Sequence, residues 1–187
     1  DPARLRQWAE DTEVVAIGET GLDYYYAPES REAQRVSFAQ HLALAAELGL
    51  PVVVHTRDAR EDTLELSRDH GSIEHGGVLH CFTESWEMAS QALDLNYWIS
   101  ISGIVTFKGA DNLRSIVRKL PLDRMLVETD SPYLAPVPYR GRSNQPAYVL
   151  AVAQAIAEIR GLTLEQVVTA TTSNYHRLFG GAGVTGD

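Results

Sequence analysis

Cysteine is almost missing from this sequence, because its 187 residues contain a single one, Cys81. A lone cysteine excludes an internal disulfide bond and a zinc module held by several cysteines. It also fits a reducing compartment, so we expect a cytoplasmic protein. Long apolar runs are lacking too: no stretch reaches the roughly 20 residues that span a bilayer, and we expect no membrane partner.

Positive charge is in short supply. The 16 Lys and Arg residues are outnumbered by 25 Asp and Glu residues, which gives a formal net charge of -9. This balance argues against a basic surface that binds phosphate backbones without specificity. A nucleic-acid substrate would need local help, which bound divalent cations supply because they reverse the sign of the charge in a site.

Apolar runs alternate with helical patterns along the chain, and this alternation predicts an α/β fold with a parallel sheet. With 44% hydrophobic and 22% charged residues, the composition is that of a globular protein, and we expect a single domain over residues 1–187. Five short apolar segments are typical of strands that are covered on both faces. They are Val14–Ile17, Val52–Val54, Gly77–Leu79, Tyr97–Ile101 and Met125–Val127.

Helices are predicted between and after these strands. The first runs from about Ser30 to Leu48 and ends at Gly49. Thr163–Gln166 has the form of a capping box that opens a later helix, and a short last helix is expected to end near Phe179. Side chains suited to the N-caps of other helices are Asp58, Thr83 or Ser85, and Asp111.

Four side chains that bind metals in proteins follow the ends of predicted strands. Glu19 follows the first strand and His55 the second, while His80 follows the third and Asp130 the fifth. Each alone has a simpler interpretation as a strand-end polar group or a cap. Because the carboxyl ends of parallel strands meet at one edge, where α/β proteins build their active sites, we expect the four to converge. Two imidazoles and two carboxylates suit Zn²⁺, Mn²⁺ or a related ion, or a pair of ions.

Six ordered motifs between Val14 and Phe179 resemble the TatD family of metal-dependent deoxyribonucleases, within the amidohydrolase-like barrels. They are Gly18–Asp23, Pro51–Ala59, Leu79–Phe82, Ser102–Lys108, Glu128–Leu134 and Arg140–Tyr148. The resemblance implies a TIM-type (β/α)₈ barrel that hydrolyses phosphodiester bonds with one or two divalent ions, Mg²⁺, Mn²⁺ or Zn²⁺. It implies metal ligands at the four residues of the predicted site, Glu19, His55, His80 and Asp130.

The sequence departs from the family pattern at its start. The family begins with a strand that carries a His-x-His pair of metal ligands, and no such pair occurs here. A (β/α)₈ barrel typically needs about 250 residues. We therefore expect a partial barrel of about the last five strands, with the N-terminal strands outside this chain, which begins at Asp1 instead of Met. Open strand edges invite pairing, so we expect another segment or chain to cover them.

The mechanism implied by the resemblance is attack of water on a phosphodiester. Bound cations lower the pKa of water and neutralise charge on the phosphate oxygens. In this mechanism Glu19 bridges a pair of ions and His55 and His80 are terminal ligands. Asp130 holds the metal and orients or deprotonates the water.

Arg57 is a candidate for binding the phosphate of a substrate. It lies two residues past His55, and its planar guanidinium would clamp a phosphate oxygen. The alternative is a surface ion pair with Asp58 or Glu61.

Two further sets of side chains are candidates for contacts with a DNA strand. Aromatic rings stack on any base, and loop cations attract phosphate, although loop cations are also commonly just solvated. The candidates are the rings of Tyr24, Tyr25, Phe82 and Trp86 and the cations Lys108, Arg140 and Arg142. For Trp86 a place in the core is the better interpretation, because Ala89 and Leu93 lie on the same helical stripe.

These expectations together predict a metal-dependent nuclease that degrades DNA, of the exonuclease type. Two alternatives stay open. One fold and one metal site serve many reactions, so the protein could be a barrel hydrolase of another ester, an amide or a lactone. Without the two ligands of the His-x-His pair, it could also be an inactive remnant that acts as a binding module.

Overall fold

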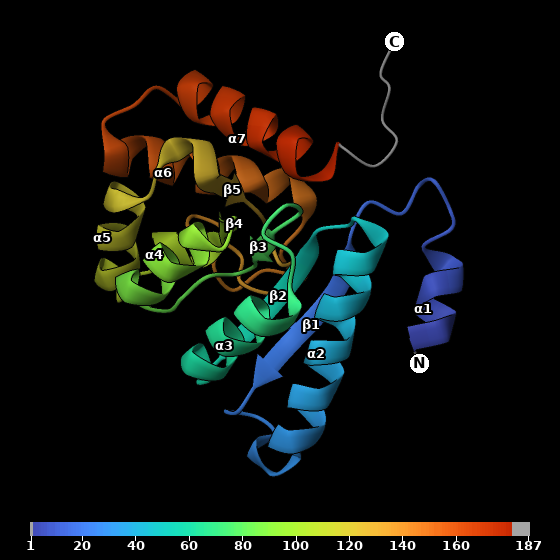
Figure 1. The fold of residues 1–187 in the computed structure, drawn as a ribbon. Helices are drawn as coiled ribbons and strands as arrows, with labels where there is room; N and C mark the ends of the chain where they lie inside the picture. The colour runs from blue at the N-terminus through green and yellow to red at the C-terminus, as the bar shows by residue number, and fades with distance from the viewer. Residues whose placement is uncertain (1, 181–187) are drawn as a thin grey trace. The chain divides into compact units, whose positions relative to one another are not determined.

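The structure is a computed structural model, and it describes residues 2–180. Strands alternate with helices along the chain, and the pairs that the strands form are parallel, which confirms the predicted α/β class (Figure 1). The strands are β1 (Ile17–Asp23), β2 (Val52–Arg57), β3 (Gly77–Leu79), β4 (Tyr97–Ile101) and β5 (Met125–Val127).

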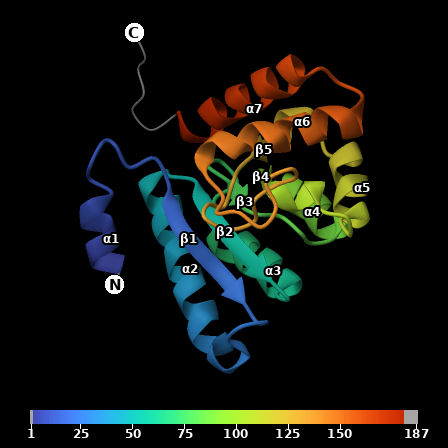
Figure 2. The same cartoon turned by 180° about the vertical axis from the view of Figure 1, so that it is seen from behind.

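Seven α-helices and four short 3₁₀ turns complete the described chain (Figures 1 and 2). The helices are α1 (Pro2–Trp8), α2 (Arg31–Leu48), α3 (Arg60–His70), α4 (Trp86–Asp94), α5 (Asp111–Lys119), α6 (Val149–Arg160) and α7 (Leu164–Phe179). The 3₁₀ turns are Pro28–Ser30, Gly103–Thr106, Leu122–Arg124 and Pro146–Tyr148.

The chain divides into two compact units. Of the described residues, the first unit holds 2–80, 90–98 and 176–180, and the second holds 81–89 and 99–175. Each unit is described by itself below. The single domain expected from the sequence stays a prediction.

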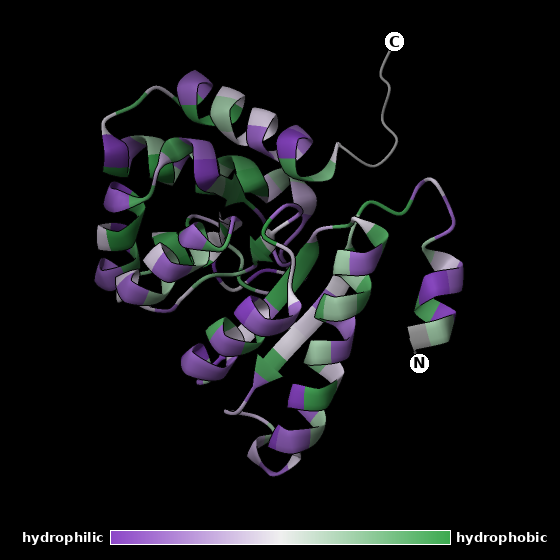
Figure 3. Cartoon of the chain, viewed as in Figure 1, coloured by the Kyte–Doolittle hydropathy of each residue, from purple (hydrophilic) through white to green (hydrophobic). Residues whose placement is uncertain are grey.

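In the first unit, β1, β2 and β3 are neighbours in that order, and all pairings are parallel. Helix α2 lies against β1, and α3 lies beside α2 and β2, as both ribbon views show. The core between them holds Phe38, Leu42, Leu22 and Val54, each at most 1% exposed. Burying side chains of this kind contributes roughly 1.5–3 kcal/mol each. In Figure 3 the first part of β2 is green, whereas α3 carries purple and green residues, as expected of a helix with one buried side.

The first strand differs from its prediction. It begins at Ile17, where the predicted Val14–Ile17 segment ends, and it continues to Asp23. The polar residues Gly18–Asp23 belong to this strand because its backbone pairs with β2, with Gly21 opposite His55. Gly21 has a φ of 136°, and a Cβ at this position would overlap the carbonyl oxygen of His55. Only glycine therefore allows β1 to approach β2 so closely.

The predicted helix over Ser30 to Leu48 is confirmed. Helix α2 occupies Arg31–Leu48, and it ends at Gly49, whose φ of 69° is the left-handed conformation of a helix C-terminus. The predicted end of the strand before α3 is wrong, because β2 runs on to Arg57. Its extra residues pair with the end of β1, and His55 consequently lies inside a strand.

The capping predictions are confirmed in part. The Thr163 N–H donates to Gln166 Oε1 at 2.9 Å and the Gln166 N–H donates to Thr163 Oγ1 at 3.1 Å, which is the predicted capping box. The Met88 N–H donates to Ser85 Oγ at 3.2 Å, so Ser85 caps α4. Two predicted N-caps are wrong, since the N-cap positions of α3 and α5 are held by the neighbouring residues Ala59 and Ala110. The N-caps predicted there were Asp58 and Asp111.

The prediction of a separate short helix at the end of the chain is also wrong. Helix α7 runs without a break from Leu164 to Phe179. This stretch contains neither glycine nor proline, so nothing in it interrupts the backbone hydrogen bonds of a helix.

In the second unit, β4 and β5 pair in parallel, with Ile101 opposite Val127. The buried side chain of Asn174 on α7 fixes the start of β5, because its amide donates to the carbonyl oxygens of Leu122 and Met125, both at 2.8 Å. These bonds satisfy carbonyl groups where the Leu122–Arg124 turn leads into β5.

No single helix among residues 2–180 has the length and the apolar composition needed to cross a membrane. Pro146–Arg160 and Leu164–Phe179 pass such a test only as a pair, with a bend of 115° between them.

Candidate metal centre

Three of the four predicted metal ligands converge within the first unit. Nε2 of His80 lies 2.9 Å from Oε1 of Glu19, and Nδ1 of His55 lies 3.4 Å from the same oxygen. Each of the three residues offers one ligand atom, and these atoms all lie within 4.8 Å of one another. The predicted convergence of these three side chains is therefore present in the fold.

Each of the three ligands is placed by a parallel strand. Between Ile17 and Thr20 the register of β1 against β2 shifts, and Glu19 lies in this irregular stretch. Irregularities of this kind re-aim a side chain next to active sites. His55 lies inside β2, and His80 follows β3, where its N–H donates to the carbonyl oxygen of Val54 at 3.0 Å. Three segments distant in sequence thus deliver their side chains to one place.

The donor set fits a divalent transition metal. One carboxylate and two imidazoles are hard-to-intermediate ligands of the kind found around Zn²⁺ and Mn²⁺. The side chains are 53% exposed for Glu19, 34% for His55 and 15% for His80, so an ion held here would also be reachable by a substrate. Three protein ligands with open positions are typical of catalytic rather than structural metal sites.

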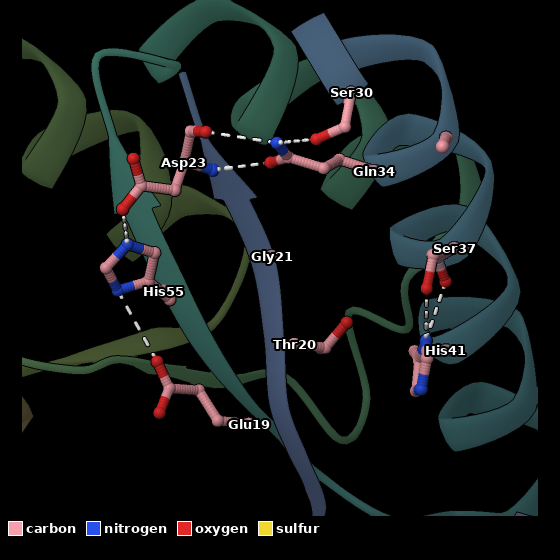
Figure 4. A pocket seen from close by; sticks show the side chains of 10 residues that line it. Glu19, Thr20, Gly21, Asp23, Ser30, Gln34, Ser37, His41 and His55 are labelled. Atoms are coloured by element: carbon pink, nitrogen blue, oxygen red, sulfur yellow. Dashed lines mark hydrogen bonds and ion pairs between the residues drawn. The ribbon is translucent and has the colours of Figure 1, made fainter. Parts of the chain in front are cut away.

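Asp23 is a residue of the centre that the sequence interpretation missed. Its Oδ2 lies 3.0 Å from Nε2 of His55, on the opposite side of the ring from Glu19 (Figure 4). In this arrangement the Nε2–H of His55 donates to Asp23, which leaves the lone pair of Nδ1 for a metal. Metal-ligating histidines commonly donate to a carboxylate, but the sequence alone does not single out Asp23 as that partner.

The Asp23 carboxyl is held as an anion. Burial raises its pKa, but the Tyr26 N–H, His55 and the Tyr25 N–H all bond to it, and the pKa of Asp23 lies below its usual value. Its backbone is fixed by Gln34, whose Oε1 accepts from the Asp23 N–H at 2.7 Å and whose Nε2 donates to the Asp23 carbonyl at 3.0 Å. The position of the carboxylate is thus set by α2 as well as by β1.

A cavity of about 580 Å³ opens beside this centre. Residues of β1 and α2 line it together with Ser30 and His55, and Figure 4 shows Glu19 and His55 on one side of β1 and His41 and Ser37 on the helix. The cavity is large enough for a nucleotide-sized group, since ligand pockets commonly hold roughly 300–1,000 Å³.

Asp130, the fourth predicted ligand, belongs to the second unit. It lies three residues after β5 with a φ of 58°, and its carbonyl accepts from the Tyr133 N–H at 2.9 Å. The buried Asn144, which the sequence interpretation also missed, donates to the carbonyl oxygens of Thr129 and Tyr133 at 2.7 and 2.6 Å. Asn144 therefore fixes the loop that carries Asp130. The roles of Asp130 as ligand and as water-orienting carboxylate stay predictions.

The predicted phosphate-binding arginine has aromatic neighbours. The Arg57 guanidinium carbon lies 4.2 Å from the ring centre of Tyr25 and 4.7 Å from that of Tyr26. Within residues 2–180 no carboxylate pairs with Arg57, so the alternative ion pairs with Asp58 or Glu61 are not formed in the described structure. The substrate-binding role of Arg57 stays a prediction.

The other predicted substrate-binding cations lie on loops of the second unit. Arg140 stands 3.8 Å from the centre of the Phe107 ring and donates to the Ala135 carbonyl at 3.2 Å, so it also holds its own loop in place. Lys108 and Arg142 are exposed. The substrate-binding roles of these three cations stay predictions.

The aromatic candidates divide clearly by exposure. Phe82 is 1% exposed, so its predicted stacking on a base is wrong: the ring belongs to the core. The Tyr24 hydroxyl donates to Asp62 Oδ2 at 2.6 Å under the Arg31 guanidinium, and its substrate contact stays a prediction. Tyr25 is 57% exposed, and a base can reach its ring.

Comparisons with known proteins agree on one family. The family described as TatD related DNase matches residues 1–180. The chain is 55% identical over 179 residues to the Escherichia coli protein named uncharacterized metal-dependent hydrolase YcfH, covering 96% of this chain and 68% of YcfH. It is 38% identical over 177 residues to the Klebsiella pneumoniae protein named 3'-5' ssDNA/RNA exonuclease TatD, covering 92% of this chain and 67% of that protein.

A solved structure shows the same fold. The crystal structure of YJJV, a TatD homologue from Escherichia coli, superposes with a TM-score of 0.89 at 30% identity, covering 96% of this chain and 70% of YJJV. The alternating α/β fold with its clustered carboxylate and imidazoles thus defines a protein of the metal-dependent hydrolase class. More specifically, the chain belongs to the family of TatD-related DNases. This confirms the resemblance and the fold of part of a TIM-type barrel, whereas the segment expected to cover its open edges stays a prediction.

Proposed function

We propose that the protein is a metal-dependent nuclease that hydrolyses the phosphodiester bonds of DNA, of the exonuclease type. The observation that carries the proposal is the convergence of Glu19, His55 and His80 in a chain of the TatD-related DNase family. The relative from Klebsiella that is named an ssDNA/RNA exonuclease supports a nucleic-acid substrate. In this proposal the DNA strand is the main partner and the cytoplasm is the site of action.

The residues of the first unit divide the work of holding the metal and the substrate. Glu19 holds a divalent ion, Mg²⁺, Mn²⁺ or Zn²⁺, through a carboxylate oxygen, and His55 and His80 hold it through Nδ1 and Nε2. When bound, such an ion neutralises charge on the phosphate and lowers the pKa of water. Asp23 keeps the His55 ring in the required tautomer, and Arg57 binds a phosphate oxygen through its N–H groups.

In this proposal Asp130, which follows β5, is the fourth metal ligand. As a fourth ligand, its carboxylate orients or deprotonates the attacking water. The exposed cations of the second unit, Lys108, Arg140 and Arg142, attract the phosphates of the strand, and Tyr24 adds an aromatic contact. Local cations matter here because the protein as a whole carries a net charge of -9.

The test is metal-dependent hydrolysis of DNA by the full-length protein. The protein is stripped with a chelator, and Mg²⁺, Mn²⁺ or Zn²⁺ is added back in the presence of an end-labelled oligodeoxynucleotide. We expect cleavage only with added metal, and a loss of at least about 100-fold in kcat/KM for His55→Ala or His80→Ala. His70→Ala, which removes an exposed histidine from the end of α3, is the matched control and retains full activity.

Two results would overturn the proposal. If the metal-loaded protein leaves DNA intact but hydrolyses an ester, an amide or a lactone in a parallel panel, it is a hydrolase of another substrate class. If it hydrolyses none of these compounds with any of the three ions, the proposed enzymatic function is refuted, and the inactive binding module is the alternative that stays open.

A further inference from the structure

A second cluster stands beside the candidate metal centre and consists of Tyr25, Tyr26 and Arg57. The two tyrosine rings are perpendicular at 88°, with their centres 4.9 Å apart. The Arg57 guanidinium lies over both rings. Tyr25 and Tyr26 are 57% and 72% exposed, so two aromatic surfaces and a cation are presented to solvent together. Isolated exposed aromatic residues are common, but this group is ordered by specific contacts.

Asp23 joins this cluster to the metal centre. One oxygen, Oδ2, holds Nε2 of His55, while the other, Oδ1, accepts from the backbone N–H groups of Tyr25 and Tyr26 at 3.0 and 2.8 Å. Asp23 also lies opposite Arg57 in the β1–β2 register, two residues beyond the Gly21–His55 pair. A single carboxylate therefore fixes the histidine ligand and the turn that carries both rings.

The Tyr25, Tyr26 and Arg57 cluster has fewer partners within the protein than the neighbouring group around Tyr24. The neighbouring Tyr24 is half-buried, its hydroxyl bonds Asp62, and the arginines around it pair with the same carboxylate at 2.7 and 2.8 Å. The charged groups around Tyr24 are thus paired with one another. By contrast, within residues 2–180 Arg57 has no carboxylate partner, and the edges of its guanidinium stay available for an anion.

We propose that Tyr25, Tyr26 and Arg57 form a nucleobase-binding subsite beside the metal centre, an inference that rests on the proposed nuclease function. A base of the DNA strand stacks on the exposed tyrosine rings. The guanidinium, stacked on Tyr25, donates to an oxygen of the adjoining phosphate. Because Asp23 fixes this turn and His55 together, binding of the base places the neighbouring phosphodiester at the metal ligands.

The proposed subsite predicts that the KM depends on the base next to the cleaved bond, whereas a surface that binds only phosphate predicts no such dependence. Two single-stranded oligodeoxynucleotides are compared that differ only by removal of the base next to the cleaved bond. Wild-type protein should show a KM roughly tenfold higher for the abasic strand. Tyr25→Ala and Tyr26→Ala should raise the KM for the complete strand by a similar factor and leave little difference between the two strands.

Three controls separate stacking from general damage. Tyr25→Phe and Tyr26→Phe should retain the preference for the complete strand, because the ring and not the hydroxyl makes the contact. Arg57→Lys keeps the charge but loses the planar group, and it should raise the KM for both strands alike. Tyr175→Ala, at an exposed tyrosine of α7, should leave both strands unaffected.

Binding without turnover keeps this inference separate from the proposed function. Fluorescence anisotropy of the labelled strands is measured in a chelator, where base-dependent affinity is seen even if no cleavage occurs. If wild-type protein cleaves DNA but Tyr25→Ala and Tyr26→Ala leave the preference for the complete strand unchanged in both assays, the subsite is refuted and the nuclease stands. If the base preference is found and depends on both tyrosines, but no metal supports cleavage, the subsite stands and the proposed hydrolysis of DNA is refuted.

Discussion

The His55 ring is held between two carboxylates, with Nε2 3.0 Å from Oδ2 of Asp23 and Nδ1 3.4 Å from Oε1 of Glu19. The two contacts have different roles. A carboxylate behind an imidazole fixes its orientation and makes the opposite nitrogen a better metal ligand, and Glu19 lies on the side of that opposite nitrogen. The geometry therefore leaves Nδ1, and not Nε2, as the nitrogen with which His55 would bind a metal in the proposed centre.

Removal of the Asp23 charge is expected to weaken metal binding. Asp23→Asn keeps the size of the side chain but loses the anion that holds the His55 N–H, so affinity for Zn²⁺ or Mn²⁺ should fall about 10- to 100-fold. Isothermal titration calorimetry measures this directly. Asp58→Asn is the control, because Asp58 is exposed with a φ of 54° that asparagine tolerates. Equal affinities of wild type and Asp23→Asn would show that Asp23 has no part in the site.

Metal binding should stabilise the fold, because β1, β2 and the residue after β3 supply the ligands. An ion that binds only the folded state at about 100 times its Kd adds about 2.7 kcal/mol to the free energy of unfolding. We therefore expect added Zn²⁺ or Mn²⁺ to raise the Tm by several degrees in differential scanning calorimetry. His80→Ala should abolish the rise, while His70→Ala retains it. A rise that survives in His80→Ala would place the stabilising ion elsewhere.

The ion pairs between Asp62 on α3 and Arg31 and Arg35 on α2 predict a dependence of stability on pH. Burial raises the pKa of Asp62, but bonds from Tyr24, Arg35 and Arg31 outweigh it and hold that pKa at about 2, below the usual 3.8. The contribution is thus present above pH 4 and is lost as the pH falls toward 2. Asp62→Asn should lower the free energy of unfolding by about 1–2 kcal/mol at pH 7, allowing for screening by solvent.

Urea unfolding of wild type and Asp62→Asn at several pH values measures this contribution. The gap between the two proteins should be constant from pH 7 to pH 5 and should narrow below about pH 4. Asp69→Asn, on the exposed side of the same helix, is the matched control and should show no such gap. A gap for Asp62→Asn that does not change with pH would mean that its charge is not what stabilises the protein.

The β1–β2 pairing that brings Glu19 to His55 depends on a glycine. Gly21→Ala should destabilise the protein by more than about 2 kcal/mol, because the added methyl group overlaps the His55 carbonyl and the φ of 136° is strained for alanine. Gly109→Ala is the comparison, since nothing lies within 4 Å of a Cβ built there. Thermal unfolding followed by circular dichroism distinguishes the two. If both substitutions cost the same, close approach of the strands is not what requires Gly21.

Strands made of continuous apolar residues could be predicted to the residue, as β3, β4 and β5 show. The first strand could not be, because Gly18–Asp23 has a polar pattern and becomes a strand by pairing with β2. Local sequence carries no signal for a partner 30 or more residues away, and the hydrogen bond of Asp23 to His55 spans 32 residues.

The residues of the candidate site also divide into those that could be predicted from the sequence and those that could not. The convergence of Glu19, His55 and His80 could be predicted from the neighbouring parallel strands, although only His80 follows the end of its strand and the other two lie inside β1 and β2. Asp23 and Asn144 could not be predicted, since their roles depend on which polar atoms face each other after folding. Which aromatic rings can contact a substrate also depends on their exposure after folding, because Phe82 is buried and Tyr25 is accessible.

The most direct measurement of the central claim is a crystal structure of the protein soaked with Mn²⁺, with diffraction data collected at the manganese absorption edge. The account predicts an anomalous peak at bonding distance, about 2.0–2.2 Å, from Nδ1 of His55, Nε2 of His80 and a carboxylate oxygen of Glu19. A peak at other residues, or none at saturating Mn²⁺, would contradict it.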